Sequence, residues 1–278
     1  MSDETPFHQR RIFYEIAGMD RVQVQRDLVY ARTEQGDLTL DVYMPPNLPQ
    51  SAHLPGVVFV HGGPLPPSIL PPEWPPIKNW GAFVSSAELV AASGLIGVTF
   101  NHRFTAHQQI NQSFEDVTAA VDYVRAHAAS FNLDPNRLCI WVFSGAGPHL
   151  YLFLHNKPRF VRCVVAYYAG MADISTTEKL AHLSSEGLSD EERRTLSVAA
   201  YLKEEATRGL PIFVARAGLD DPETNWWIDV FVQEALAANA TLDLANHPTG
   251  RHAFDILDDD ARTRQIIAST IEFIKANV

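Results

Sequence analysis

Cysteine and positive charge are both scarce in this chain of 278 residues. The two cysteines, Cys139 and Cys163, each lie within an apolar run, and a disulfide framework or a cysteine-rich metal site would need more of them. Lys and Arg number 22 against 33 Asp and Glu, so the net charge is -11. Binding to nucleic acid or to an anionic membrane requires clustered positive charge. The composition therefore predicts buried, reduced thiols and argues against both kinds of partner.

Long apolar runs are also missing. No stretch of about 18 consecutive apolar residues occurs, so we expect no membrane-spanning helix. The first residues, Met1 to Pro6, carry acids and no apolar core, so we expect no secretory signal and a cytoplasmic location. Hydrophobic residues make up 46% of the chain, which is typical of a folded globular protein, and the length suits one domain over 1–278.

What the sequence does contain is a series of short apolar runs separated by helix-compatible segments. Residues 22–30 and 38–42 alternate imperfectly, with Gly36-Asp37 as a turn signal, and predict an antiparallel pair of strands. The later runs are continuously apolar, as is typical of strands buried on both faces. These runs are Val57–Val60, Leu95–Phe100, Leu138–Phe143, Val161–Tyr167, Ile212–Ala215 and the weaker Thr241–Ala245. The pattern predicts the α/β class, with a mostly parallel sheet and helices on both faces.

The clearest helical period runs from Phe114 to Ala128, and Ser113 with Asp116 predicts a capping box at its start. Two segments interrupt the alternation of strands and helices. Residues 64–76 hold seven of the chain's 18 prolines and must form a stiff loop. Residues 172–207 are polar and helix-prone, which predicts a helical insertion that could serve as a lid.

A serine follows one of the buried strands directly. The strand Leu138–Phe143 leads into Ser144, whose next neighbours Gly145 and Ala146 are small, and a helix-compatible run follows from His149. A serine on such a tight strand-to-helix turn projects at the carboxyl edge of the sheet. The N–H of Gly145 would lie at a helix N-terminus, where negative charge is stabilised. The alternative interpretation is a serine that only caps a helix.

Three other features also follow strands. His61-Gly62-Gly63 comes directly after Val57–Val60, and glycine lets the backbone approach a ligand without a Cβ in the way. Asp220 lies just beyond Ile212–Ala215, and His252 lies on a loop after the last strand. Each feature alone could be an ordinary turn, but the carboxyl ends of parallel strands meet at one edge of a sheet.

With Ser144, Asp220 and His252 in this order, the chain resembles the α/β-hydrolase family, closest to its esterase and dienelactone-hydrolase-like branches with a His-Gly-Gly motif. The resemblance covers roughly residues 38–275. The family pattern Gly-x-Ser-x-Gly reads Val142-Phe-Ser144-Gly-Ala146 here, so both outer glycines are replaced. The resemblance implies the α/β-hydrolase fold and the following roles. Ser144 would be the nucleophile, His252 the base, Asp220 the orienting acid, and Gly62, Gly63 and Gly145 the oxyanion donors.

Other residues compete for these roles. Asp221 and His247 are rivals to the orienting acid and the base, and we expect His247 to be structural. His61 is also expected to be structural. His102 and His149 have no partner that the sequence identifies, although both could lie near the edge of the site.

The favoured hypothesis is a serine esterase that acts on small esters without a metal or organic cofactor. The Pro-rich loop follows the glycines, so Leu65, Trp74 and the nearby Trp80 are predicted to form an apolar wall for the substrate. A second hypothesis is an amide or lactone hydrolase with the same machinery, such as an arylformamidase, a dienelactone hydrolase or a small peptidase. A third is a non-catalytic ligand-binding protein on the same scaffold, which Val142 favours. The sequence leaves a homodimer open.

Overall fold

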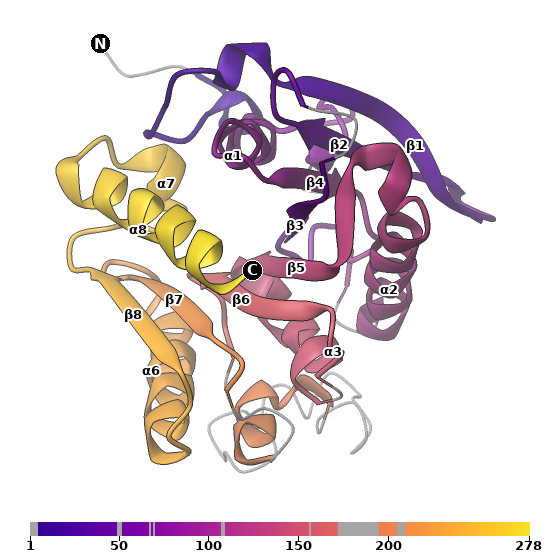
Figure 1. Ribbon diagram of the computed structural model, residues 1–278. Helices are drawn as coiled ribbons and strands as arrows, with labels where there is room; N and C mark the ends of the chain where they lie inside the picture. Colours follow the sequence, from indigo (N-terminus) through magenta and orange to yellow (C-terminus); the bar gives the residue numbers. More distant parts are fainter. Residues whose placement is uncertain are drawn as a thin grey trace.

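One eight-stranded sheet runs through the molecule (Figure 1). The computed structural model describes residues 5–48, 52–66, 68, 70–106, 109–155, 157–171, 195–204 and 209–278. The strands lie in the order β1-β2-β4-β3-β5-β6-β7-β8, and β2 is antiparallel to both of its neighbours while the remaining pairs are parallel. The strand bounds are β1 Gln23–Thr33, β2 Gly36–Met44, β3 Leu54–Val60, β4 Ile96–Phe100, β5 Leu133–Phe143, β6 Val161–Tyr167, β7 Ile212–Ala217 and β8 Leu242–His247.

The central strands are buried on both faces because alternate side chains enter two separate cores. In β3, Val58 and Val60 belong to one apolar cluster, whereas Val57 and Phe59 belong to the other. Helices α2, α3 and α6 cover the first cluster, and α1 and α8 cover the second (Figure 1). The helices are α1 Gly81–Ala92, α2 Ile110–Ala126, α3 Tyr151–Leu154, α6 Pro222–Ala237, α7 Phe254–Leu257 and α8 Ala261–Asn277. Short 3-10 turns are η1 Phe7–Gln9, η2 Met19–Arg21, η3 Ile77–Asn79, η5 Ala128–Phe131, η6 Ser144–Leu150 and η8 Val198–Lys203.

The architecture confirms the predicted fold class, and six predicted buried strands match β3 to β8. Two local predictions are wrong. The first hairpin turns at Glu34 and Gln35, because Gly36 already pairs with Thr33 as the first residue of β2. Helix α2 begins at Ile110, so Ser113 lies inside the helix and does not cap it. The side chain of Ser113 is turned inward to two buried histidines, which outweighs its local capping preference.

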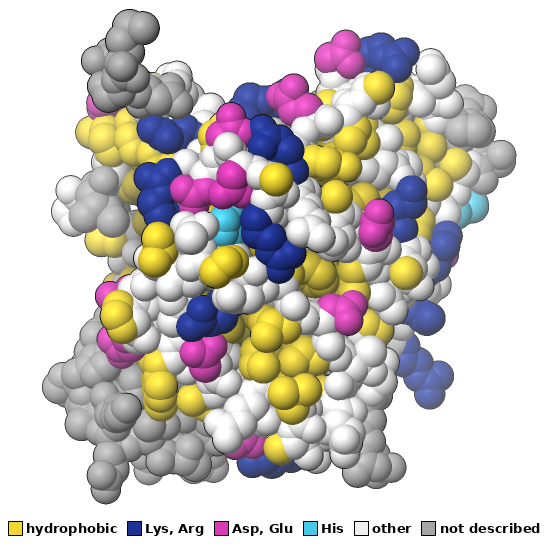
Figure 2. Space-filling model, turned by 90° about the vertical axis from the view of Figure 1, so that its left-hand side faces the viewer, with side chains coloured by type: hydrophobic (Ala, Val, Ile, Leu, Met, Phe, Trp, Pro, Cys, Tyr) yellow, Lys and Arg dark blue, Asp and Glu magenta, His cyan; other side chains and the backbone are white. Residues whose placement is uncertain are grey.

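Both cysteines are buried and free, as predicted, and lie opposite one another on β5 and β6. Of the predicted insertion at 172–207, only residues 195–204 are described, and they contain η8; the rest of that prediction lies outside the described residues. Among the described helices, none is long and apolar enough to cross a membrane. On the face seen in Figure 2, Lys and Arg side chains are interspersed with Asp and Glu, so its described residues form no extended basic patch.

The described part of the Pro-rich segment 64–76 forms neither helix nor strand, as predicted. Its ends are fixed by two hydrogen bonds. The Leu65 N–H donates to the Phe104 carbonyl over 2.9 Å, and the Trp80 indole N–H donates to the Pro75 carbonyl over 3.0 Å. Direct anchoring of this kind positions the loop beside the carboxyl end of β3.

A buried ion pair attaches the next segment to the sheet. The Lys78 ammonium in η3 donates to Asp41 of β2 over 2.5 Å and to Asp27 over 2.8 Å. Both Lys78 and Asp41 are almost fully buried, so neither charge is compensated by water. The hydrogen bond from Lys78, and then its charge, lower the pKa of Asp27.

We predict that Lys78→Met lowers the free energy of unfolding by about 3 kcal/mol, because it leaves the Asp41 carboxylate buried with only the more distant Arg26 as a cationic partner. Urea unfolding followed by circular dichroism measures the change. The control is Arg32→Met, which removes an exposed partner 3.9 Å from Asp37 and should cost less than about 1 kcal/mol. Equal losses in the two variants would contradict this account of the pair.

Candidate active site

The chain turns abruptly from strand to helix at Ser144. Strand β5 ends at Phe143, and Ser144, the first residue of η6, adopts a left-handed backbone conformation with φ of 52°. A serine rarely adopts this conformation, and such residues cluster at functional sites. The turn is made by Ser144 itself, so Val142 remains an ordinary strand residue, paired with Val60 and Ala166 and buried in the core. A branched side chain at 142 is therefore compatible with the turn.

Two hydrogen bonds join Ser144, His252 and Asp220. The Ser144 hydroxyl lies 2.8 Å from His252 Nε2, and His252 Nδ1 lies 2.7 Å from Asp220 Oδ2. An ionised carboxylate only accepts hydrogen bonds, so Nδ1 carries the proton and Nε2 is left to accept from the hydroxyl. These side chains follow β5, β8 and β7, whose carboxyl ends lie along one edge of the sheet. The structure thus brings together all three residues that the sequence singled out.

The rival residues have other contacts. Asp221 caps α6 by accepting the Glu223 N–H over 2.8 Å. His247 is buried, with Nε2 3.1 Å from the Thr263 hydroxyl and 3.2 Å from Asp260. In contrast, the Asp220 side chain is 3% exposed and the His252 side chain 43% exposed, so the carboxylate is shielded while the imidazole is open to solvent.

The predicted oxyanion glycines lie where two backbone segments meet. A Cβ on Gly145 would lie 1.5 Å from the Gly63 carbonyl oxygen, and one on Gly62 would lie 2.8 Å from Ser144 Cβ. Only glycine fits at either position. The N–H groups of Gly62 and Gly63 have no acceptor among the described residues, and the Gly145 N–H belongs to the first turn of η6, which has no intrahelical partner. All three glycines lie next to the serine with N–H groups available to a ligand.

Two histidines orient the peptide units of this loop. His61 Nδ1–H donates to the Gly62 carbonyl over 2.8 Å, and His102 Nε2–H donates to the His61 carbonyl over 3.1 Å. In a trans peptide the C=O and the following N–H point in opposite directions. The N–H groups of Gly63 and Gly62 are therefore held pointing away from the histidine rings. The His61 ring thus contacts the backbone of its own loop.

The same network continues to the nucleophile side of the site. The Ser113 hydroxyl lies 2.7 Å from both His102 Nδ1 and His149 Nε2, and His149 Nδ1 lies 3.2 Å from the Ala146 carbonyl. Burial lowers the pKa of His61 to about 4 and that of His149 to about 3, and it holds the pKa of His102 well below its usual value. The three rings are thus neutral near pH 7. Sequence reasoning found no partners for His102 and His149, because these contacts join α2, the segment after β4 and η6 only in the fold.

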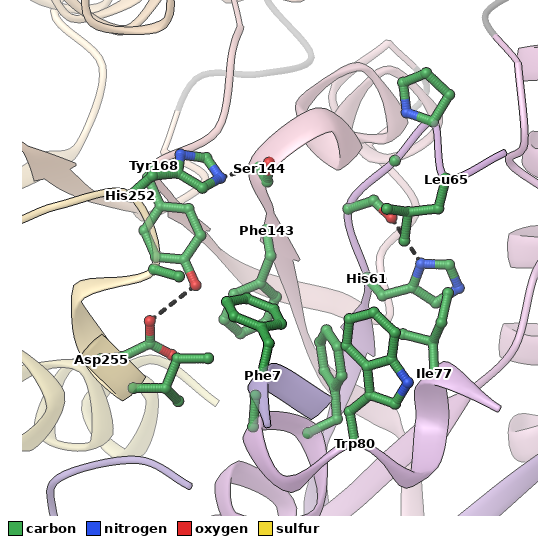
Figure 3. A pocket seen from close by; sticks show the side chains of 17 residues that line it. Phe7, His61, Leu65, Ile77, Trp80, Phe143, Ser144, Tyr168, His252 and Asp255 are labelled. Atoms are coloured by element: carbon green, nitrogen blue, oxygen red, sulfur yellow. Dashed lines mark hydrogen bonds between the residues drawn. The ribbon is translucent and has the colours of Figure 1, made fainter. Parts of the chain in front are cut away.

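A cavity of about 260 Å³ opens beside Ser144 (Figure 3). Its wall is mostly aromatic and aliphatic, with Phe7, Ile77, Trp80, Phe83, Phe143 and Ile256 among the lining residues. Leu65 and Trp80 line it, as the sequence analysis anticipated. Trp74 does not line it; its ring instead packs edge-on against that of Trp80, with the ring centroids 5.4 Å apart.

Two polar residues that the sequence analysis missed also line the cavity. The Tyr168 ring lies 4.7 Å from the His252 ring, and its hydroxyl donates to Asp255 over 2.9 Å. Burial raises the pKa of Asp255 to about 6. Asp255 is three residues beyond His252, and that short spacing was the only signal in the sequence. In the part of the chain that the structure describes, no group of three His, Cys, Asp or Glu is placed to hold a metal ion.

Known proteins share this architecture. Residues 40–159 match the BD-FAE family. Human carboxylesterase 3 is 30% identical over 118 residues, which are 39% of this chain and 18% of the human protein, so the chain spans less than a fifth of that relative. Among solved structures, esterase 2 of the planctomycete Thermogutta terrifontis with butyrate bound is 16% identical, with a TM-score of 0.73 over 93% of this chain and 95% of that one. Its paraoxon-phosphorylated form is 17% identical with a TM-score of 0.68 at the same coverage.

The strand order, the strand-to-helix turn at Ser144 and these similarities agree with one another. The chain is therefore an α/β-hydrolase in fold, with a BD-FAE match over residues 40–159.

Proposed function

We propose that this protein is a serine hydrolase that cleaves small carboxylic esters. The observation that carries the proposal is the hydrogen-bonded chain from the Ser144 hydroxyl through His252 to Asp220, open at its serine end to an apolar cavity. The similarity to carboxylesterase 3 and to an esterase with butyrate bound supports ester substrates with a short acyl group.

In the first half of the reaction, the Ser144 oxygen attacks the ester carbonyl carbon while His252 Nε2 takes the hydroxyl proton. Asp220 keeps the other ring nitrogen protonated and stabilises the imidazolium that forms. The N–H groups of Gly62, Gly63 and Gly145 donate to the oxyanion of the tetrahedral intermediate. Each such donor is worth about 3 kcal/mol in the transition state. The intermediate collapses as His252 returns the proton to the leaving alcohol.

The second half repeats these steps with water. His252 takes a proton from a water molecule that attacks the acyl-enzyme carbonyl, and the Ser144 oxygen then leaves with that proton. The high solvent exposure of the His252 side chain gives water a path to the acyl-enzyme. Leu65 and Trp80 contribute to the wall against the bound acyl or alcohol group.

The proposal includes one domain over residues 1–278 and a cytoplasmic location. The continuous eight-stranded sheet is consistent with the first, and the two buried free thiols are consistent with the second. A lid at 172–207 and a homodimer remain predictions.

We predict that Ser144→Ala lowers turnover of p-nitrophenyl acetate by four or more orders of magnitude, because the nucleophile is removed. The control Ser130→Ala, at an exposed serine, should keep wild-type activity. Wild-type rates on p-nitrophenyl acetate should exceed those on p-nitroacetanilide and on an aryl formamide. Near-wild-type turnover in Ser144→Ala would overturn the nucleophile, and a dominant amide rate would overturn the ester assignment.

Adjacent acids provide a second, matched test. Asp220→Asn should lower kcat by about 10⁴, because the amide favours the wrong tautomer of His252. Asp221→Asn should change kcat less than about twofold, since asparagine caps a helix as well as aspartate does. Steady-state kinetics on p-nitrophenyl acetate measures both. If the two variants lose activity equally, Asp220 has no special role.

A further inference from the structure

The wall of the cavity contains a buried carboxylate that the proposed reaction does not use. Asp255 is 2% exposed, follows His252 by three residues and lines the cavity with Ser144. In Figure 3, Asp255 and Tyr168 lie on one side of the cavity, Ile77 and Trp80 lie on the other, and Phe7 lies between them. The hydrogen-bonded chain from Ser144 to Asp220 is complete without Asp255.

This carboxylate has few partners. A carboxylate can accept about four hydrogen bonds; among the described residues the Tyr168 hydroxyl on Oδ1 is the one side-chain donor to Asp255, and the backbone N–H of Asp255 itself also donates. None of the described residues that line the cavity is lysine or arginine. Two other titratable neighbours act on Asp255: the charge of His252 favours the ionised carboxylate, whereas Asp258 is an acid whose charge is engaged by Arg251. A buried carboxylate without a lysine or arginine partner is costly, and such groups concentrate at binding sites.

The remainder of the wall suits a cation. Aromatic rings line the cavity from several elements, including Phe7, Trp80, Phe83, Phe143 and Tyr168. The faces of aromatic rings carry partial negative charge and attract ammonium groups. An anion or a strongly hydrated neutral group would gain nothing from this combination of rings and carboxylate.

We infer that the cavity beside Ser144 binds a small apolar group that carries an ammonium, with an N–H donated to Asp255 and the positive charge against the aromatic rings. The inference rests on the proposed hydrolase function and specifies its substrate class: amine-bearing esters with a compact hydrocarbon or aryl group. Neutral esters of the same shape are poorer substrates, because they leave the buried carboxylate without an ammonium, lysine or arginine partner.

Isothermal titration calorimetry with benzylamine and benzyl alcohol tests the site without requiring catalysis. At pH 7.5 benzylamine is protonated, and the wild-type protein should bind it at least about tenfold more tightly than benzyl alcohol. Benzylamine should also inhibit p-nitrophenyl acetate hydrolysis competitively. Equal affinities for the two probes in the wild type would overturn the inference, whether or not the protein hydrolyses esters. Absence of ester hydrolysis would instead count against the proposed function.

Matched variants test whether Asp255 supplies the negative charge that binds benzylamine. Asp255→Asn should reduce the preference for benzylamine to about twofold or less, while Asp259→Asn, which removes the same charge at an exposed position four residues away, should preserve it. Tyr168→Phe should keep the preference, because it leaves the carboxylate in place. Retention of the preference in folded Asp255→Asn, or its loss in Tyr168→Phe, would contradict the assignment to Asp255. If Asp255→Asn does not fold, the affinities of the wild type and of Tyr168→Phe for benzylamine and benzyl alcohol still test whether the cavity prefers an ammonium.

Discussion

Two hydrogen bonds between the ends of three strands are the interaction on which the rest of the site depends. Ser144 and His252 are 108 residues apart in the chain, and His252 and Asp220 are 32 apart, yet their polar atoms meet at 2.8 and 2.7 Å. The parallel register of β5 to β8 makes this convergence possible, because it aligns the carboxyl ends of all four strands. A serine hydroxyl gains a basic partner only through that alignment.

The opposite side of the cavity is held just as firmly by buried polar groups. His61 and His102 fix the glycine peptides, and Ser113 links His102 to His149 on the nucleophile's own helix. The ion pair of Lys78 attaches η3, and with it the wall residues Ile77 and Trp80, to β2. Buried groups of this kind are costly unless paired, so once paired they favour one arrangement of the wall. The site is preorganised by its surroundings.

Much of this could be predicted from the sequence, because the strongest signals are local. Continuous apolar runs identified the inner strands. Ser144 directly after one run, together with the family resemblance for Asp220 and His252 in later loops, identified the three site residues. The prediction failed where long-range contacts override local preference. Ser113 looks like a helix cap but bonds to His149, 36 residues away, and Asp255 meets Tyr168 across 87 residues of sequence. Spacing along the chain does not encode such pairs.

The most direct test of the account is covalent labelling with a fluorophosphonate, followed by peptide mapping by mass spectrometry. We expect one adduct per chain, on Ser144, formed at least about 10³-fold more slowly in His252→Ala because the hydroxyl then lacks its base. A label on another serine, or equal labelling rates in the wild type and His252→Ala, would show that the hydrogen-bonded chain at the strand ends does not activate Ser144.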